Sequence, residues 1–205
     1  MSDFGTFVLN QLPPSPGRVL EVGCGTEGGV VALLADAGYD ALGVDPAAPD
    51  GVRFRRERFQ DVGGEWDAVV AGRVLHHVHP LDEGIAHLAS LAPVLVVDEF
   101  SRDLIEPQGQ DWYEAQHRML VAAGAAPPGP PSLDEWGGRH ADLHSHVVLL
   151  DVLRTHYEER VLEWVPYFHR WLGGPSSEAL EASLVGAGAF PAIGYRWAGV
   201  RRARR

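Results

Sequence analysis

The residues from Arg18 to Gly29 constrain the fold of this chain more than any other stretch of its sequence. Their first five residues are mostly apolar and β-favouring, as in a buried strand. Gly23, Gly25 and Gly28 follow with the G-x-G-x-x-G spacing of nucleotide-binding turns. Apolar residues at helical spacing come next, and Gly38 stands where a helix would end. We therefore predict a strand, a glycine turn and a helix whose first N–H groups face a ligand.

Further apolar segments alternate with helical patterns along the first half of the chain. We expect strands over residues 40–45, 52–59, 65–72 and 93–100. Strands that alternate with helices form a parallel, doubly wound sheet with helices on both faces. The sequence therefore predicts an α/β fold. A chain of 205 residues suits one domain, which we expect to span 1–205.

Composition excludes several classes of protein. The formal charge of −11 argues against general binding of nucleic acid, which depends on cations placed against phosphates. No apolar run approaches membrane-spanning length, and the first residues lack the features of a signal peptide. We therefore expect a cytoplasmic protein with no membrane partner. The single cysteine, Cys24, excludes an internal disulfide.

Glu21, just before the first glycines, separates two kinds of nucleotide site. A dinucleotide-binding turn places a diphosphate at the helix start, where a nearby carboxylate would repel it. An acid in this place favours a ligand that carries positive charge. A NAD-dependent oxidoreductase is therefore the less favoured alternative.

The stretch from Glu21 to Gly25 resembles the first motif of the class I S-adenosylmethionine-dependent methyltransferases, which has the form acid-x-Gly-x-Gly-x-Gly. The third glycine, Gly28, falls one place late. The resemblance implies a mostly parallel seven-stranded sheet, completed by late strands near Arg160 and Tyr195, the last of them antiparallel. It implies S-adenosylmethionine as cofactor, with its methionine part packed against Gly23, Cys24 and Gly25 and its ammonium end held by Glu21.

The adenosine part of the cofactor is expected at the next strand ends. Asp45 ends the expected strand 40–45 at the edge where open α/β sheets bind ligands, and one carboxylate can accept from both ribose hydroxyls. In the resembling family an acid after the third strand accepts from the adenine amino group, and Asp61 fits that position. A solvated turn carboxylate is the alternative for Asp61. The resemblance also implies cofactor contacts by Pro46, Gln60, Val62 and Gly72.

The run from Val74 to Val78 resembles the segment that borders the transferable methyl group in small-molecule methyltransferases. A neutral imidazole can take a proton from a hydroxyl or amine near neutral pH, so His77 is the first candidate base and His76 the second. Packing or capping suits the two histidines equally well. Glu99, at the end of the expected strand 93–100, orients a substrate or supports the strand end.

The pattern after Phe100 indicates a helical cap inserted at residues 101–146. A helix over 103–123, a Pro- and Gly-rich loop over 124–131 and a segment over 133–146 together suit a substrate wall. Its candidate substrate contacts are Trp112, Tyr113, His117 and His144. The alternative is a packed surface excursion. Histidines cluster over 140–146, but capping or a substrate contact is favoured there over a metal, and we expect no metal site.

These features predict methyl transfer from the sulfonium of S-adenosylmethionine to an oxygen, nitrogen or carbon nucleophile of a small molecule. A methyltransferase-like protein that binds the cofactor but acts as a silent regulator or partner is the alternative. The expected partner is a small-molecule acceptor. A homodimer is compatible with the sequence, which does not fix the oligomeric state.

Overall fold

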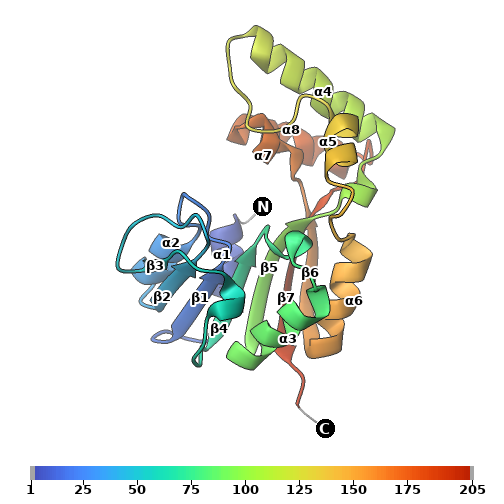
Figure 1. Ribbon diagram of the computed structural model, residues 1–205. Helices are drawn as coiled ribbons and strands as arrows, with labels where there is room; N and C mark the ends of the chain where they lie inside the picture. Colours follow the sequence, from blue (N-terminus) through green and yellow to red (C-terminus); the bar gives the residue numbers. More distant parts are fainter. Residues whose placement is uncertain (1–2, 204–205) are drawn as a thin grey trace. The chain divides into compact units, whose positions relative to one another are not determined.

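The computed structural model describes residues 3–203 and has a seven-stranded sheet with the order β3-β2-β1-β4-β5-β7-β6 (Figure 1). β1 pairs in parallel with β2 and β4, β2 with β3, and β4 with β5. The strands are β1 Arg18–Val22, β2 Asp40–Val44, β3 Phe54–Arg55, β4 Ala68–Gly72, β5 Val94–Phe100, β6 Tyr157–Val165 and β7 Gly194–Arg201.

β7 runs against its neighbour β5. The Arg201 N–H donates to the Pro93 carbonyl and the Ser101 N–H to the Ile193 carbonyl, each at 2.7 Å, so the start of one strand lies beside the end of the other. An antiparallel β7 in a sheet that is otherwise parallel over β1 to β5 confirms the predicted fold class. The expected strand over 52–59 shrinks to the two residues of β3, and Val52 before it is fully exposed.

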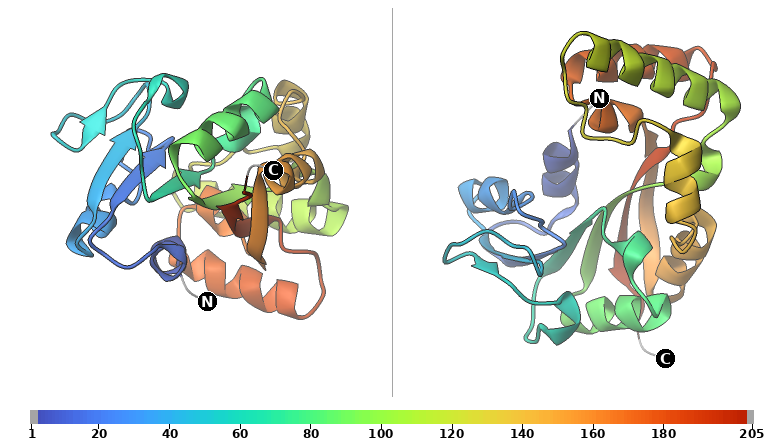
Figure 2. Two further views of the ribbon diagram at one scale, coloured as in Figure 1. Left: turned by 90° about the horizontal axis from the view of Figure 1, so that it is seen from below. Right: turned by 45° about the horizontal axis from the view of Figure 1, so that its top comes forward.

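The described chain divides into two compact units. We call the first the sheet unit; its described residues are 3–99, 147–162 and 196–203. α1 and α2 pack against one face of its sheet, and α3 and α6 cover the other (Figure 2). The helices of this unit are α1 Phe4–Gln11, α2 Val31–Asp36, α3 Leu81–Leu91 and, from its second residue on, α6 His146–His156, with the 3-10 turns η1 Phe59–Asp61 and η2 Leu75–His77.

The core of the sheet unit lies between the strands and the first two helices. Phe7 and Val8 of α1 and Leu34 of α2 are at most 2 % exposed. They pack with apolar strand residues that include Val70 and Val96. Asp3 fixes the start of α1, because its carboxylate accepts the Thr6 N–H at 2.7 Å, a typical N-cap.

The second unit, which we call the aromatic unit, holds residues 100–146 and 163–195. Its core is a buried cluster of Phe100, Tyr113, Leu133, Tyr167, Phe168, Leu172, Phe190 and Ile193. The unit therefore includes a second segment besides the expected cap over 101–146. Its elements are η3 Arg102–Leu104, α4 Pro107–Ala122, α5 Leu133–Arg139, α7 Phe168–Leu172 and α8 Pro175–Gly186.

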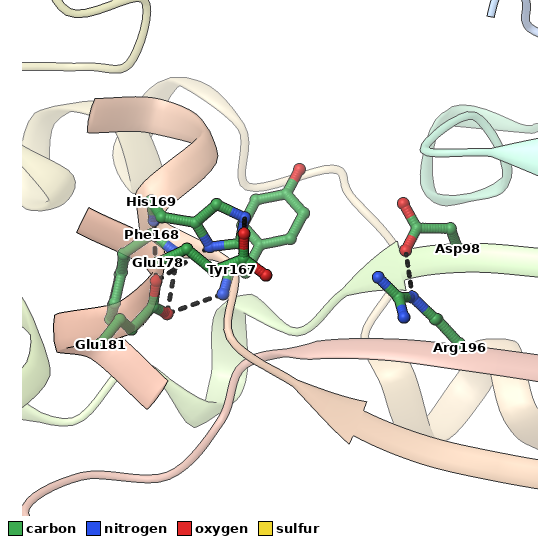
Figure 3. A network of polar contacts seen from close by, with 7 residues as sticks. All are labelled: Asp98, Tyr167, Phe168, His169, Glu178, Glu181 and Arg196. Atoms are coloured by element: carbon green, nitrogen blue, oxygen red, sulfur yellow. Dashed lines mark hydrogen bonds and ion pairs between the residues drawn. The ribbon is translucent and has the colours of Figure 1, made fainter. Parts of the chain in front are cut away.

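One buried carboxylate fixes the start of α7. Glu181, on α8 and 1 % exposed, accepts the N–H groups of Tyr167 at 2.6 Å, Phe168 at 3.0 Å and His169 at 2.8 Å (Figure 3). Its Oε2 also lies 3.1 Å from Nδ1 of His169. These bonds satisfy the amino end of a helix of five residues that has no side-chain cap from the residue before it.

Candidate active site

The glycine turn after β1 takes backbone conformations that other residues rarely adopt. Gly23 and Gly25 have φ values of 75° and 61°. A Cβ on Gly23 would lie 2.5 Å from Cβ of Val74. Gly28, the displaced third glycine, is also left-handed, at φ 78°. The first glycine is thus required both by its backbone angle and by a close neighbour.

Glu21 is turned into the protein beneath this turn. Its side chain is 2 % exposed and accepts the Val30 N–H at 2.7 Å, at the start of α2. Burial raises the pKa of Glu21 to about 7, although the hydrogen bonds from the helix start oppose that rise. Glu21 therefore fastens the glycine turn to the helix. Its contact with the cofactor's ammonium group stays a prediction.

A cavity of about 270 Å³ lies in the sheet unit at the carboxyl ends of the strands. It brings together five residues that the sequence singled out: Gly23, Asp45, Pro46, Gln60 and His77. Val74 and Val78, the ends of the run expected to border the methyl group, also line the cavity. The remaining lining residues were not predicted; they are Val44, Arg58, Phe59 and His79. For Phe59 the available signal was an apolar ring next to Gln60 in the sequence, because a bound ring needs apolar walls.

Other predicted cofactor residues lie outside this lining. Asp61 is exposed, whereas Val62 and Cys24 are buried. Burial, helped by nearby carboxylates, raises the pKa of the Cys24 thiol to about 11, so the thiol stays protonated at neutral pH. Gly25 is left-handed in the turn, and Gly72 ends β4. Their contacts with cofactor stay predictions.

Asp45 follows β2 directly and lines the cavity half-buried. Its Oδ1 accepts the Ala47 N–H at 2.7 Å, which closes a turn of the kind that aspartate favours. This bond holds the carboxylate at the strand end. A carboxylate fixed at this edge suits the predicted contact with ribose hydroxyls.

The histidine pair after β4 is split between the cavity and the core. His77 is exposed and lines the cavity, while His76 is 6 % exposed. Nδ1 of His76 lies 2.6 Å from Oε2 of Glu99, which is fully buried. The centroids of the two imidazole rings lie 4.2 Å apart. Of the three predicted catalytic residues, the structure therefore places only His77 on the cavity wall. His76 and Glu99 are buried and do not line the cavity.

Asp98, the other acid at the end of β5, is used in ion pairs. It is 1 % exposed, and its carboxylate lies 3.6 Å from Nε of Arg196 (Figure 3) and 4.0 Å from Nε of Arg73. Arg73 has a φ of 57° and donates its N–H to the Asp98 carbonyl at 2.7 Å. Asp98 thus ties together the ends of β4, β5 and β7.

The predicted substrate residues of the aromatic unit differ in exposure. Tyr113 is fully buried and donates its hydroxyl to the Pro130 carbonyl at 2.7 Å. His117 is 6 % exposed, and its Nε2 lies 3.2 Å from the Gly129 carbonyl. These two residues hold the loop after α4. Trp112 and His144 are half-buried. A role of all four in acceptor binding stays a prediction.

Metal and membrane features were searched over residues 3–203. Within that range no group of three or more His, Cys, Asp and Glu side chains is placed to hold a metal ion. His140, from the histidine-rich stretch, has its Nδ1 2.8 Å from the Trp136 carbonyl, as a residue at a helix end. No helix in the same range has the length and apolar character needed to cross a membrane.

The α/β sheet carries a left-handed glycine turn, and the cavity at its carboxyl edge has Asp45 and His77 on its wall. These features together define a nucleotide-binding class of protein. A family model described as a methyltransferase domain matches residues 1–181. The chain therefore belongs to the methyltransferase-domain family. It is an S-adenosylmethionine-dependent methyltransferase, and S-adenosylmethionine is its cofactor.

Solved structures share the fold at low sequence identity. An S-adenosylmethionine-dependent methyltransferase from Mesorhizobium loti is 15% identical with a TM-score of 0.58, over 96% of each chain. The magnesium protoporphyrin IX methyltransferase of Synechocystis with bound SAH is 17% identical at 0.55, over 97% of this chain and 80% of that one. The geranyl diphosphate C-methyltransferase of Streptomyces coelicolor A3(2) is 12% identical at 0.58, over 97% and 78%. No curated protein matches the chain.

Proposed function

We propose that the protein transfers the methyl group of S-adenosylmethionine to an oxygen, nitrogen or carbon nucleophile of a small molecule, with the adenosine part of the cofactor in the cavity beside β2. The observation that carries the proposal is the lining of that cavity. Asp45 supplies an acceptor for ribose hydroxyls, and Phe59, Val74 and Val78 supply apolar walls for a ring.

The proposed reaction requires little covalent chemistry from the protein itself. When bound, S-adenosylmethionine supplies a methyl group on a positively charged sulfur, which is already activated for transfer. Asp45 and the apolar lining residues would hold the adenosine part of the cofactor, so that its methyl group would be presented to the acceptor. The chain contributes by aligning the two molecules and by excluding water.

His77 is proposed as the base for an acceptor that carries a proton. It is the exposed member of the histidine pair and lines the cavity wall. A neutral ring nitrogen takes the proton that the acceptor hydroxyl or amine loses, so the positive charge of the sulfonium ends on the imidazole. General-base help of this kind is worth typically about 10²–10⁴-fold in rate.

Binding is the first test of the proposed function. Calorimetry should detect S-adenosylmethionine and S-adenosylhomocysteine but not NAD. Heat with NAD alone would overturn the proposed use of the cavity. A screen of small hydroxyl, amine and activated-carbon acceptors, with products detected by mass spectrometry, then separates an enzyme from a silent relative, which would bind cofactor and methylate nothing.

Replacing His77 tests the base. His77→Ala should lower kcat at least about tenfold and leave cofactor affinity within about threefold, and the wild-type rate should fall at acid pH as the imidazole protonates. His79→Ala is the matched control, because His79 is also exposed and lines the same cavity. Full activity of His77→Ala across pH 6 to 8 would leave alignment alone as the mechanism.

A further inference from the structure

One side of the cofactor cavity is built from a short segment whose regular structure is limited to one 3-10 turn. Val74, His77, Val78 and His79 line the cavity, and η2 within this segment has only three residues. No side chain caps its start from the residue before it. So short a turn has little stability by itself, and its position depends on contacts from elsewhere in the fold.

Glu99 supplies these contacts from β5. Its Oε1 accepts the Leu75 N–H at 2.7 Å and the His76 N–H at 3.4 Å, and its Oε2 lies 2.6 Å from Nδ1 of His76. The carboxylate is fully buried. Burial strengthens these hydrogen bonds, because it removes the water that would compete for the donors. One side chain thus holds two consecutive residues of the segment at three points.

We propose that Glu99 and His76 are positioning residues, which hold the η2 segment so that His77 and its apolar neighbours form the wall of the cofactor cavity. Neither residue needs to touch cofactor or acceptor. Their effect comes from preorganisation, since a wall that is ordered during folding does not have to be ordered again when the ligand binds. The inference rests on the proposed use of this cavity for the cofactor.

The aromatic unit contains a control of the same construction. We use the term carboxylate clamp for a buried glutamate that accepts backbone N–H groups at the start of a short helix and contacts a histidine there. Glu181 is such a clamp for α7, and it contacts His169 (Figure 3). His169 thus corresponds to His76 beside Glu99. Replacing Glu181 should therefore disrupt the carboxylate clamp of the aromatic unit and leave the wall of the cavity in the sheet unit unchanged.

The experiment compares Glu99→Gln with Glu181→Gln. Calorimetry with S-adenosylhomocysteine measures affinity, and amide hydrogen exchange measures the order of each segment. Glu99→Gln should weaken binding about tenfold and speed exchange over 74–79, whereas Glu181→Gln should speed exchange over 167–169 and leave affinity within about threefold. Wild-type affinity in a folded Glu99→Gln, or an equal loss in both variants, overturns the proposal.

His76 gives a second pair of variants that does not depend on Glu99→Gln folding. His76→Ala removes the contact with Oε2 of Glu99 and should weaken binding several-fold. His76→Asn places an amide N–H near the position of Nδ1 and should restore most of the affinity. A loss of equal size in both variants would contradict positioning through Glu99. Absence of binding by the wild-type protein would instead remove the proposed function itself.

Discussion

The sheet unit and the aromatic unit each contain a carboxylate clamp, but the two clamps have different surroundings. Glu99 holds residues beside a cavity, whereas Glu181 holds residues of a packed aromatic cluster. In that cluster Phe100 and Tyr167 stack with ring centroids 4.8 Å apart, and Tyr113 and Phe168 stack at 5.4 Å. The comparison teaches that the same arrangement of hydrogen bonds can stand beside a cavity in one unit and within a packed core in the other.

The largest expected effect comes from the glycine turn of the sheet unit. Gly23→Ala adds a left-handed strain and a clash with Val74, and relief of the clash should displace this wall of the cavity. We expect a loss of about 3 kcal/mol of cofactor binding, or roughly 150-fold. Calorimetry with S-adenosylhomocysteine measures the loss.

The matched control lies in the aromatic unit. Gly188 has a nearly equal φ of 73°, and a Cβ there would meet no atom within 4 Å. Gly188→Ala should therefore carry strain without changing affinity. If Gly188→Ala and Gly23→Ala lose affinity equally, the difference in surroundings between the two units does not explain the effect on cofactor binding.

The next effect concerns pH and the carboxyl group of Glu21. Because burial raises its pKa from 4.5 to about 7, the folded chain binds more protons than the unfolded chain between these values. Stability should therefore fall as pH rises through this window, by an amount on the order of 3 kcal/mol. Urea unfolding at pH 5 and pH 7.5 measures the difference.

Glu21→Gln should flatten this part of the stability profile, since an amide does not titrate. If Glu21→Gln keeps the slope, another group is responsible for it, and burial of Glu21 does not set the proton balance of the sheet unit.

A smaller effect is expected at Asp45. Asp45→Ala should cost roughly 1.5–3 kcal/mol of cofactor binding, or about 10- to 150-fold, because a charged acceptor of ribose hydroxyls is lost. Asp45→Asn keeps an oxygen for the Ala47 N–H and should fall between the wild type and the alanine variant. Asp134→Ala, at an exposed acid of the aromatic unit, is the control. An unchanged dissociation constant for Asp45→Ala would place the ribose elsewhere.

The smallest effect on cofactor is expected in the aromatic unit itself. Trp112→Ala should raise the KM of the acceptor and leave cofactor affinity within about threefold, because uniform contacts with substrate act on KM. Trp112 suits this test because it is only half-buried, whereas Tyr113→Ala would leave a cavity in the aromatic cluster. A loss of cofactor affinity with an unchanged acceptor KM would contradict the predicted role of this segment.

The sequence predicted those parts of the molecule that local pattern determines. The glycine spacing located the turn, and the apolar runs located the strands and so placed Asp45 and His77 at the carboxyl edge of the sheet. These features depend on residues that are close together in the chain. The sequence pattern was therefore sufficient to predict the fold class and part of the cavity lining.

Contacts between distant residues could not be predicted in this way. Glu99 and Leu75 are 24 positions apart, and no spacing rule joins a strand-end acid to a turn so far away. α7 was missed for the same reason, since its five residues are held by Glu181 from another helix. A short helix stabilised by a remote side chain leaves no periodic signal of its own.

The strand order has a consequence for how the sheet is completed during synthesis. β6 joins the sheet only through β7, which lies between β5 and β6 but follows both in the chain. β6 therefore cannot pair with the rest of the sheet until residues 194–201 have left the ribosome. The parallel strands β1 to β4 carry no such delay, because all of their partners in the sheet have been made once β5 is complete.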